Sequence, residues 1–267
     1  MTRPDARLLS RVELAVPTLA LLVAALALWA AGGALVVAGH PVAGLLAAAL
    51  AAYLGFTPMH DAAHQAVGRH RWLNAVVGRL AALPLAAPYP AFRYLHLEHH
   101  KHTNDPARDP DHYSGRGPAW LLPWRWLTQD LDYYRRYVRA GRSRGEYAEV
   151  AATLCAMLAL MGALLWLGHW RWVVFGWVLP ARIAATGLAY AFDYLPHRPH
   201  VVLGRDDRYR ATSMRPARWL TPILVCQNHH LIHHLYPAVP FYRYPAVWRD
   251  REAEIRARGA HIIEPAR

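Results

Sequence analysis

HDAAH (residues 60–64), HLEHH (96–100) and HLIHH (230–234) share one histidine spacing, and each segment lies just beyond an apolar run long enough to meet a membrane. Residues three and four apart on a helix are spatial neighbours. The imidazoles of each segment, called here a histidine box, are therefore predicted to project together. The three boxes supply eight imidazoles, those of His60, His64, His96, His99, His100, His230, His233 and His234.

Eight imidazoles are too many for one structural zinc ion, which four ligands normally close. They suit two six-coordinate transition metals with room left for O2. Imidazole accepts Zn, Cu, Fe or Ni, so the ligand type alone does not choose the metal. Without metal, so many packed imidazoles would leave polar groups unpartnered or gather positive charge, and both are costly.

The composition fits either a large soluble domain or a small membrane protein, because 55% of the 267 residues are hydrophobic. Their concentration in long blocks, with arginine between the blocks, favours the membrane protein. The two cysteines, Cys155 and Cys226, form no CxxC motif and predict neither a disulfide framework nor a thiolate zinc site. The net charge of +12 comes almost wholly from arginine and is typical of a cytoplasmic membrane face. Anionic lipids or an acidic redox partner could use the same surface.

The predicted fold is an all-α integral membrane protein with four transmembrane helices in two hairpins and a cytoplasmic helical cap that carries the boxes. The first apolar run is too long for a signal peptide, and a second run follows at once. The segment 72–90 is broken by three prolines and predicts a re-entrant or interfacial hairpin. The whole chain is interpreted as a single domain, 1–267, with transmembrane segments at about 14–38, 42–59, 150–167 and 172–194.

This topology places both termini, the three boxes and His197 on one side of the membrane. Nearly all the arginine lies on that side, and Arg171 is the only fixed positive charge in the two short loops opposite. We therefore expect a multi-pass inner-membrane protein with both termini and the metal site in the cytoplasm. The polar segment 101–149, rich in Trp, Tyr and Arg, is typical of helices that lie along the head groups.

Other polar residues near the boxes have predicted supporting roles. Acceptors beyond the ligands orient metal-bound imidazoles, and such acceptors are expected at Asp61, Glu98, Asp105 and Asp109. Asn228 is a further candidate. His229 points about 100° away from His230 around a helix of 3.6 residues per turn, so it is expected to orient a ligand or to be solvated. His102 follows box two by two residues and is not expected on the helix face that carries the box imidazoles. Solvated positions are expected for the lone histidines His40, His70, His169, His200 and His261.

Longer motifs carry a family resemblance. HDAAH, HLEHHKHTNDPARDPDHY, FDYLPHRP and QNHHLIHHLYPAVPFYRY resemble the membrane fatty-acid desaturase/hydroxylase superfamily. Within it they are most similar to the cyanobacterial-type, desaturase-like β-carotene 3-hydroxylases. The resemblance covers roughly residues 57–244. Three boxes in order, with TND after the second and LYP after the third, make it specific.

The resemblance implies two non-haem irons, with O2 as co-substrate, bound by the box histidines and one more histidine after the last span. His197 occupies that position. Asp193 stands four residues earlier, where the family has an asparagine that acts through water. A carboxylate there could ligate directly or hold a water, and both interpretations stay open. His229 is a second departure, because an aromatic residue is expected there in the carotenoid hydroxylases.

Arg182 lies near the middle of the fourth predicted span, beside Pro180. Placing a charged arginine side chain within a membrane costs free energy, so such a residue is a functional candidate by default. The favoured interpretation is a side chain that faces the bundle and binds carbonyls freed near Pro180. The alternative is a polar anchor for a substrate head or ring oxygen.

The chain is thus predicted to be an O2-dependent non-haem di-iron oxidoreductase that hydroxylates a lipid-soluble substrate. The box-three and FDYLPHRP motifs favour the β-carotene ring at C3, with zeaxanthin as product. The electron donor is expected to be ferredoxin or a similar small acidic carrier, because the chain has no dinucleotide-binding fingerprint or haem-attachment motif. The alternatives are an acyl-lipid or acyl-CoA desaturase, a metal transporter or sensor, and a hydrolytic zinc enzyme. Zinc hydrolysis would leave most of the histidines unexplained.

Overall fold

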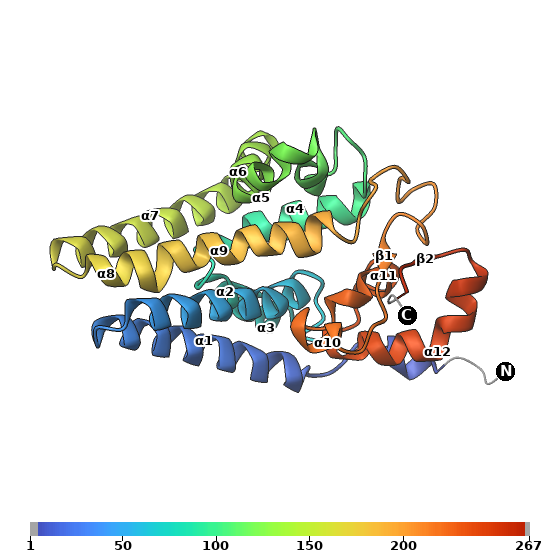
Figure 1. Ribbon diagram of the computed structural model, residues 1–267, viewed down its shortest axis with the longest axis horizontal. Coiled ribbons are helices and arrows are strands. Elements are labelled where there is room, and N and C mark those ends of the chain that lie inside the picture. Colours follow the sequence, from blue (N-terminus) through green and yellow to red (C-terminus); the bar gives the residue numbers. More distant parts are fainter. Residues whose placement is uncertain (1–4, 265–267) are drawn as a thin grey trace.

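The structure is a computed structural model that describes residues 5–264, and it is built almost wholly from helices (Figure 1). Four helical segments of this part of the chain are long and apolar enough to cross a membrane, and they form two antiparallel hairpins. They are α1 (Val16–Val37), α2 (Pro41–Ala63), α7 (Arg144–Trp166) and the continuous segment Trp170–Tyr194. The predicted fold class is confirmed.

Glycines let the first hairpin pack tightly. A Cβ atom on Gly32 would lie 2.9 Å from the carbonyl oxygen of Gly44, and one on Gly44 would lie 2.6 Å from the carbonyl oxygen of Gly32. Small residues allow such close backbone approach between membrane helices. Gly39 turns the chain between α1 and α2 with a φ of +90°, a conformation that glycine adopts without strain.

The fourth span is helical but irregular. It comprises α8 (Trp170–Val173), a π-helical turn (Val174–Val178), α9 (Leu179–Leu188) and a second π-helical turn (Ala189–Tyr194). Pro180 has no N–H to give the carbonyl four residues earlier, that of Gly176. The indole of Trp29 donates to this carbonyl at 2.9 Å. A group that would be costly to leave unpaired in lipid is thereby satisfied, and the two hairpins are joined.

Two helix boundaries differ from the prediction. Helix α2 runs on to Ala63, so His60 lies within the spanning helix and does not follow it. Helix α7 begins at Arg144, six residues before the predicted start at Val150. The cause is a capping box, in which the Ser143 side chain accepts from the Glu146 N–H and the Glu146 side chain accepts from the Ser143 N–H.

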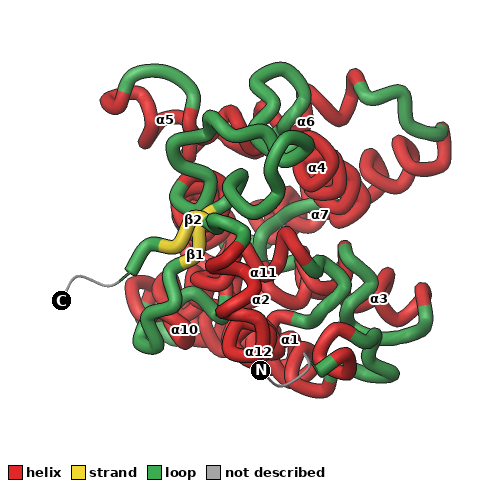
Figure 2. The backbone as a smooth tube through the Cα atoms, turned by 90° about the vertical axis from the view of Figure 1, so that its right-hand side faces the viewer, coloured by secondary structure: helices red, strands yellow, loops and turns green. Residues whose placement is uncertain are grey.

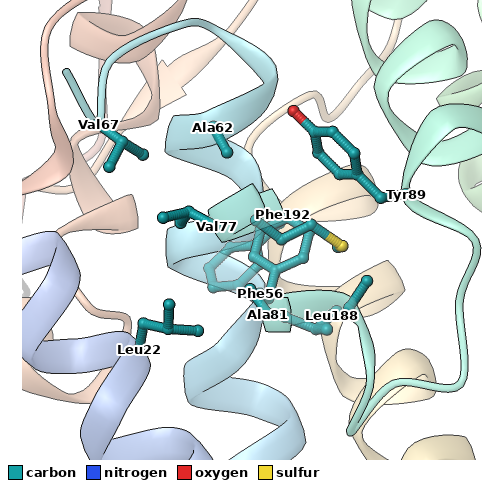
Figure 3. Close-up of a cluster of buried hydrophobic side chains, with 11 residues drawn as sticks. Leu22, Phe56, Ala62, Val67, Val77, Ala81, Tyr89, Leu188 and Phe192 are labelled. Atoms are coloured by element: carbon teal, nitrogen blue, oxygen red, sulfur yellow. The ribbon is translucent and has the colours of Figure 1, made fainter. Parts of the chain in front are cut away.

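The segment 72–90 forms helix α3 (Arg71–Ala82), a turn, and the start of α4 (Tyr89–His102). Twelve residues are too few to span a bilayer, so α3 does not add a fifth span. Side chains from α2, α3 and the fourth span meet in one apolar cluster that includes Phe56, Val77 and Phe192 (Figure 3). This cluster fixes the end of α2 that carries the first histidine box.

Most of the remaining elements form a cap at the end of the bundle where both ends of the described chain lie (Figure 1). Figure 2 views this cap and its one pair of short parallel strands. The cap elements are the 3-10 helices Ala6–Leu9, Gln227–His229 and Phe241–Arg243, the α-helices α10 (Leu220–Ile223), α11 (His230–Leu235) and α12 (Tyr244–Ala257), and the strands β1 (Ser213–Met214) and β2 (His261–Ile262). The 3-10 helices Asp111–Gly115 and Ala119–Leu121 and the α-helices α5 (Leu122–Leu127) and α6 (Gln129–Arg139) lie against α4 and the fourth span.

Candidate metal centre

The three histidine boxes occupy helix ends that converge. Box one ends α2, box two forms the last turns of α4, and box three begins α11. His197 joins them from the turn that follows the fourth span. The nine predicted imidazoles fall into two clusters, and within each cluster the ligand atoms lie within 4.8 Å of one another. The five-histidine cluster holds His60, His64, His96, His100 and His233, and the four-histidine cluster holds His99, His197, His230 and His234.

Each imidazole presents its Nε2 atom to its cluster. Three Nε2–Nε2 distances in the five-histidine cluster are 2.7 Å (His64 to His96), 2.7 Å (His100 to His233) and 3.0 Å (His60 to His233). In the four-histidine cluster, His230 lies 3.1 Å from His197 and 3.0 Å from His234. Two nitrogens bound at right angles to one metal, with bonds of about 2.1 Å, would be about 3 Å apart. These distances are therefore those of ligands around a shared ion.

The clusters adjoin one another. The rings of His100 and His234, which belong to different clusters, stack with centroids 4.3 Å apart. Nε2 of His99 and Nε2 of His234 lie 3.3 Å apart in the four-histidine cluster. Box two therefore divides between the clusters, His96 and His100 going to one and His99 to the other. Simple same-face spacing does not predict this division.

Burial keeps most of these imidazoles neutral, as metal ligation requires. It lowers the pKa values of His96, His230 and His233 well below the usual histidine range, and the neighbouring imidazoles lower them further. His99 is the exception. Burial lowers its pKa, but the carboxylates of Asp109 and Asp111 outweigh burial and raise it to about 9.

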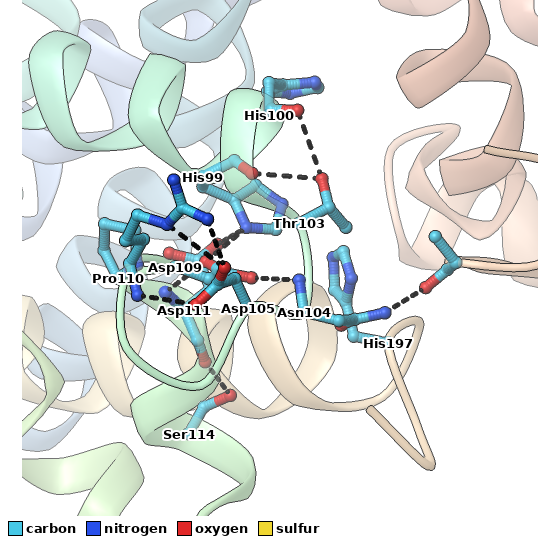
Figure 4. Close-up of polar contacts among 12 residues, drawn as sticks. His99, His100, Thr103, Asn104, Asp105, Asp109, Pro110, Asp111, Ser114 and His197 are labelled. Carbon is cyan, nitrogen blue, oxygen red and sulfur yellow. Dashed lines mark hydrogen bonds and ion pairs between the residues drawn. The ribbon is translucent and has the colours of Figure 1, made fainter. Parts of the chain in front are cut away.

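The contact behind this exception orients His99. Its Nδ1 lies 2.8 Å from Oδ1 of Asp109 and 3.4 Å from Oδ2 of Asp111 (Figure 4). Asp109 also accepts from the backbone N–H of Asn104 at 2.6 Å. Asn104 adopts a φ of +65°, which asparagine tolerates, and its side chain donates to two backbone carbonyls of the segment after His197. The TND motif thus ties box two to that segment.

A second orienting contact was not predicted. Nδ1 of His233 lies 3.0 Å from the hydroxyl oxygen of Tyr244, the first residue of α12. With Nε2 directed at the five-histidine cluster, Nδ1 carries the hydrogen and donates to this oxygen. Tyr244 ends the motif after box three, but nothing in its spacing from His233 indicated the contact.

Three of the four predicted orienting carboxylates do not contact a box imidazole. Asp61 accepts from Thr18 Oγ1 at 2.8 Å and from the Phe241 N–H at 3.3 Å, so it joins α2 to α1 and to the C-terminal segment. Glu98 lies 3.5 Å from Lys101 and from His102. Asp105 pairs with Arg108 and Arg205. These predictions were wrong because Asp61 and Glu98, although on the box helices, point to other partners, and helix spacing does not say which way the loop after α4 turns. Only Asp109 contacts an imidazole of its box.

Other candidate residues lie beside the clusters. The Asn228 amide donates to the carbonyls of Arg215 and Ala217 and so holds the loop before box three. His229 is 3% exposed and belongs to neither cluster, which overturns the solvated alternative. The carboxylate of Asp193 lies outside both clusters and lines the adjoining cavity. Of the lone histidines, His200 contradicts the expected solvation, because both its ring nitrogens are buried.

A cavity of about 440 Å³ adjoins the clusters. Its walls come from α2, α4, α6, α7 and the fourth span. They are mainly apolar and aromatic, and include Phe56, Phe92, Leu95, Met157, Leu188 and Phe192. His60, His96, His99 and His230 reach the same cavity. Leu158 is 68% exposed and Val178 44% exposed, although both line the cavity, so it lies directly beneath the lipid-facing surface of the second hairpin.

Arg182 lines this cavity too, and its partner is a carboxylate from α6. Its guanidinium donates to both carboxylate oxygens of Asp130 at 2.7 Å and to the Leu127 carbonyl at 2.9 Å. The Arg182 side chain faces the bundle, as the favoured interpretation of the sequence predicted. The carbonyl that it binds, however, belongs to α5 and not to the backbone near Pro180. The Asp130 pair was missed because no local spacing links residues 52 positions apart.

Fold and site together define an all-α integral membrane protein with a polyhistidine centre beside an apolar cavity. The family model named fatty acid desaturase matches residues 35–266, most of the chain. The chain belongs to the fatty acid desaturase family, a family of membrane oxidoreductases, and the predicted superfamily is confirmed.

Relatives with curated names include carotenoid and lipid enzymes. The chain is 34% identical to a beta-carotene ketolase of Paracoccus sp. (strain N81106 / MBIC 01143) over 230 residues, 78% of this chain and 81% of the relative. It is 33% identical to the beta-carotene ketolase of Paracoccus sp. (strain PC1), with 78% of this chain and 80% of the relative covered. It is 25% identical to an sn-1 oleoyl-lipid 12-desaturase of Synechocystis sp., with 70% and 61% covered.

Proposed function

We propose that the nine imidazoles bind two non-haem irons and that the enzyme oxygenates a methylene group of a lipid-soluble substrate, most specifically the β-carotene ring. The observation that carries the metal assignment is the Nε2 geometry of the two clusters. Their donor sets consist of imidazole nitrogens at separations that fit octahedral coordination, and the four-histidine cluster leaves more room for O2. Closed structural zinc sites need fewer ligands, and membership of an oxidoreductase family argues against a transporter, a sensor or a zinc hydrolase.

When bound, the irons would supply O2 activation for removal of hydrogen from an unactivated C–H bond. The protein supplies the rest. Asp109 and Tyr244 hold the rings of His99 and His233 in the orientation that directs Nε2 inward. The apolar cavity walls exclude water and bring the substrate carbon beside His60, His96 and His230.

The cavity supports a hydrocarbon substrate. Its volume of about 440 Å³ lies within the usual range of small-molecule sites, and its aromatic lining suits the cyclic end of a polyene. Its position beneath the lipid-facing surface suits a substrate that arrives from the bilayer. The ketolase relatives and the motifs around box three support a carotenoid over an acyl chain, and the desaturase relatives are less similar.

Hydroxylation at C3, giving zeaxanthin, is our proposed reaction because the box-three and FDYLPHRP motifs resemble the 3-hydroxylases. Ketone formation on the same ring is the second candidate, because the two Paracoccus relatives are named ketolases. Both reactions begin with removal of hydrogen from a ring methylene group. They differ in which carbon the cavity presents and in whether that carbon is oxidised again.

Pigment analysis in a bacterium that accumulates β-carotene tests the proposal. We expect zeaxanthin from the wild-type chain and none from His99→Ala, whereas His70→Ala, at an exposed lone histidine, should retain the wild-type product. A ketone product would replace the proposed reaction with the second candidate. New acyl double bonds with unchanged carotenoids would refute the carotenoid assignment in favour of the desaturase.

Purified enzyme provides an independent test of the metal. We expect two irons per chain and their loss in the His99→Ala and His233→Ala variants. Preparations that hold only zinc, and that form product nonetheless, would refute the iron assignment. We further propose that the clusters face the cytoplasm and that a small acidic iron–sulfur protein such as ferredoxin supplies electrons, because nearly all the arginines lie on the same side as the clusters.

A further inference from the structure

A polar hollow of about 360 Å³ lies between the loop after box two and the helices α5 and α6. Four arginines and one carboxylate line it: Arg116, Arg125, Arg135, Arg136 and Asp132. Asp132 pairs with Arg135 and Arg136 at 2.6 Å each. Within residues 5–264, no carboxylate pairs with Arg116 or Arg125. Arg125 lies over the Tyr113 ring at 4.4 Å, and its Nε is buried without a hydrogen-bond partner. The hollow is therefore positively charged and suits an anionic surface.

Three imidazole rings in a row, called here the imidazole file, connect this hollow to the metal centre. His112 lines the hollow, and its ring centroid lies 5.7 Å from that of His200. The His200 ring lies 6.1 Å from the ring of His197, at an angle of 22°. His197 belongs to the four-histidine cluster. The hollow and the metal centre are thus separated by one intervening side chain, that of His200.

The surroundings of His200 are unusual for a structural histidine. Both ring nitrogens are buried, and neither has a hydrogen-bond partner. Buried polar groups are normally paired, and an unpaired group needs an explanation. Gly115 packs directly against the ring, so that a methyl group added at Gly115 would overlap it. The ring is therefore held between His112 and His197 by packing and not by hydrogen bonds.

We propose that the hollow docks a small acidic one-electron carrier of the iron–sulfur class, and that the file His112–His200–His197 carries the electron inward. This inference rests on the proposed function, which needs two electrons and two protons per O2 from outside the chain, because one oxygen atom enters the substrate and the other leaves as water. In each encounter the reduced carrier loses one electron and the metal centre gains one, and two encounters complete one turnover. Short gaps between packed aromatic rings favour electron transfer, because its rate falls steeply with the gap.

A phospholipid phosphate is the rival occupant of the hollow. Trp120 and Trp124 are 79% and 60% exposed beside it, as expected at a membrane boundary. The imidazole file favours the carrier, because a lipid site needs no contact with His197. Charge complementarity alone would not decide between them.

Binding of the carrier can be measured without iron in the enzyme. The metal-free chain, in nanodiscs of neutral phosphatidylcholine, is titrated with an acidic [2Fe–2S] ferredoxin at low salt. Arg116→Glu should weaken binding about tenfold, and the difference should shrink at high salt. Arg249→Glu, an equal charge change at an exposed position on α12, should bind like the wild type. Equal affinities for all three proteins would overturn the docking proposal. The proposal would also be overturned if Arg116→Glu bound ferredoxin like the wild type but no longer retained phosphatidylglycerol that co-purifies with the wild-type protein.

Reduction of the iron-loaded enzyme by pre-reduced ferredoxin tests the file. In stopped-flow experiments, His200→Leu should slow reduction several-fold at unchanged ferredoxin affinity, and His200→Phe, which keeps an aromatic ring, should restore much of the rate. His70→Leu should reduce at the wild-type rate. Dithionite should reduce all variants fully, which shows that the iron is present. Wild-type rates in His200→Leu would overturn the file. Normal docking and reduction without an oxidised carotenoid would contradict only the proposed function.

Discussion

The Nδ1 atom of His99 lies 2.8 Å from Oδ1 of Asp109, and both side chains are 1% exposed. The contact leaves Nε2 of His99 free to face the four-histidine cluster. It also anchors the TND turn, because the other Asp109 oxygen accepts from the Asn104 N–H. One carboxylate thus fixes both the ring and the loop that follows box two.

Asp109→Asn should therefore weaken metal binding without unfolding the protein. The amide keeps the size of the side chain and one acceptor oxygen, but it removes the charge that makes the His99 ring a stronger ligand. Orienting partners of this kind are worth about 10–100-fold in metal affinity. We expect a loss of that order for iron, measured by competition with a chelator.

Asp206→Asn is the matched control, because that carboxylate is 65% exposed and lies outside both clusters. It should bind iron like the wild type. Wild-type affinity in Asp109→Asn would show that packing alone holds the His99 ring.

Tyr244→Phe tests the contact that orients His233. The substitution removes only the hydroxyl that Nδ1 of His233 contacts at 3.0 Å. Because His233 belongs to the five-histidine cluster, we expect the iron of that cluster to dissociate first on chelation, while the other iron is retained longer. Iron analysis at stepwise chelator concentrations measures this. Tyr242→Phe, a partly buried tyrosine two residues earlier, should leave both irons at wild-type affinity.

Much of this centre could be predicted from the sequence because helix geometry is local. The spacing of His96, His99 and His100 predicts neighbouring rings on any helix. The apolar runs likewise predict four spans, and the turn glycines Gly39 and Gly168 lie between them as expected. The Ser143–Glu146 capping box was also readable and would have placed the start of α7 correctly.

Contacts between distant segments could not be predicted in the same way. The division of box two between the clusters depends on where α11 docks, and the Arg182–Asp130 pair depends on how α6 folds against α9. His200 was expected to be solvated because a lone histidine at a membrane interface usually is, whereas Gly115, from the 3-10 helix Asp111–Gly115, packs against its ring. Each of these features is set by tertiary packing that one sequence does not encode locally.

The Arg182–Asp130 pair should serve the packing of α6 against α9. Arg182→Leu leaves Asp130 without its partner and should lower the melting temperature by about 3 °C, the size expected for a partly exposed pair worth about 1 kcal/mol. Arg182→Gln combined with Asp130→Asn should recover part of the loss, because the two amides can still hydrogen-bond. Thermal unfolding in detergent measures both variants.

The product profile separates this role from a substrate anchor. If the pair only packs helices, the double variant should make the wild-type carotenoid product. A changed oxidation position in the double variant, with its stability partly recovered, would instead favour contact between Arg182 and an oxygen of the substrate.

Ala185→Phe should block the cavity while sparing the metals. Ala185 lines the cavity from α9, so a phenyl group there would occupy substrate space, whereas no histidine of either cluster lies on that helix. We expect normal iron content and a strong loss of carotenoid oxidation. Ala151→Phe, at an exposed position on α7, is the control for adding a phenyl group to a spanning helix. Equal activity in both variants would mean that the substrate does not use this cavity.

Membrane sidedness follows from the arginine distribution and can be tested with single cysteines in a Cys155→Ser, Cys226→Ser background. His40 and His169 are exposed in the two turns at one end of the bundle, and Arg249 is exposed on α12 at the other end. Positive charge accumulates on the cytoplasmic side, so a membrane-impermeant maleimide should label His40→Cys and His169→Cys in intact bacteria whose outer membrane has been permeabilised. Arg249→Cys should react only after the inner membrane is opened. The reverse pattern would place the histidine clusters on the outer side and would exclude a cytoplasmic electron donor.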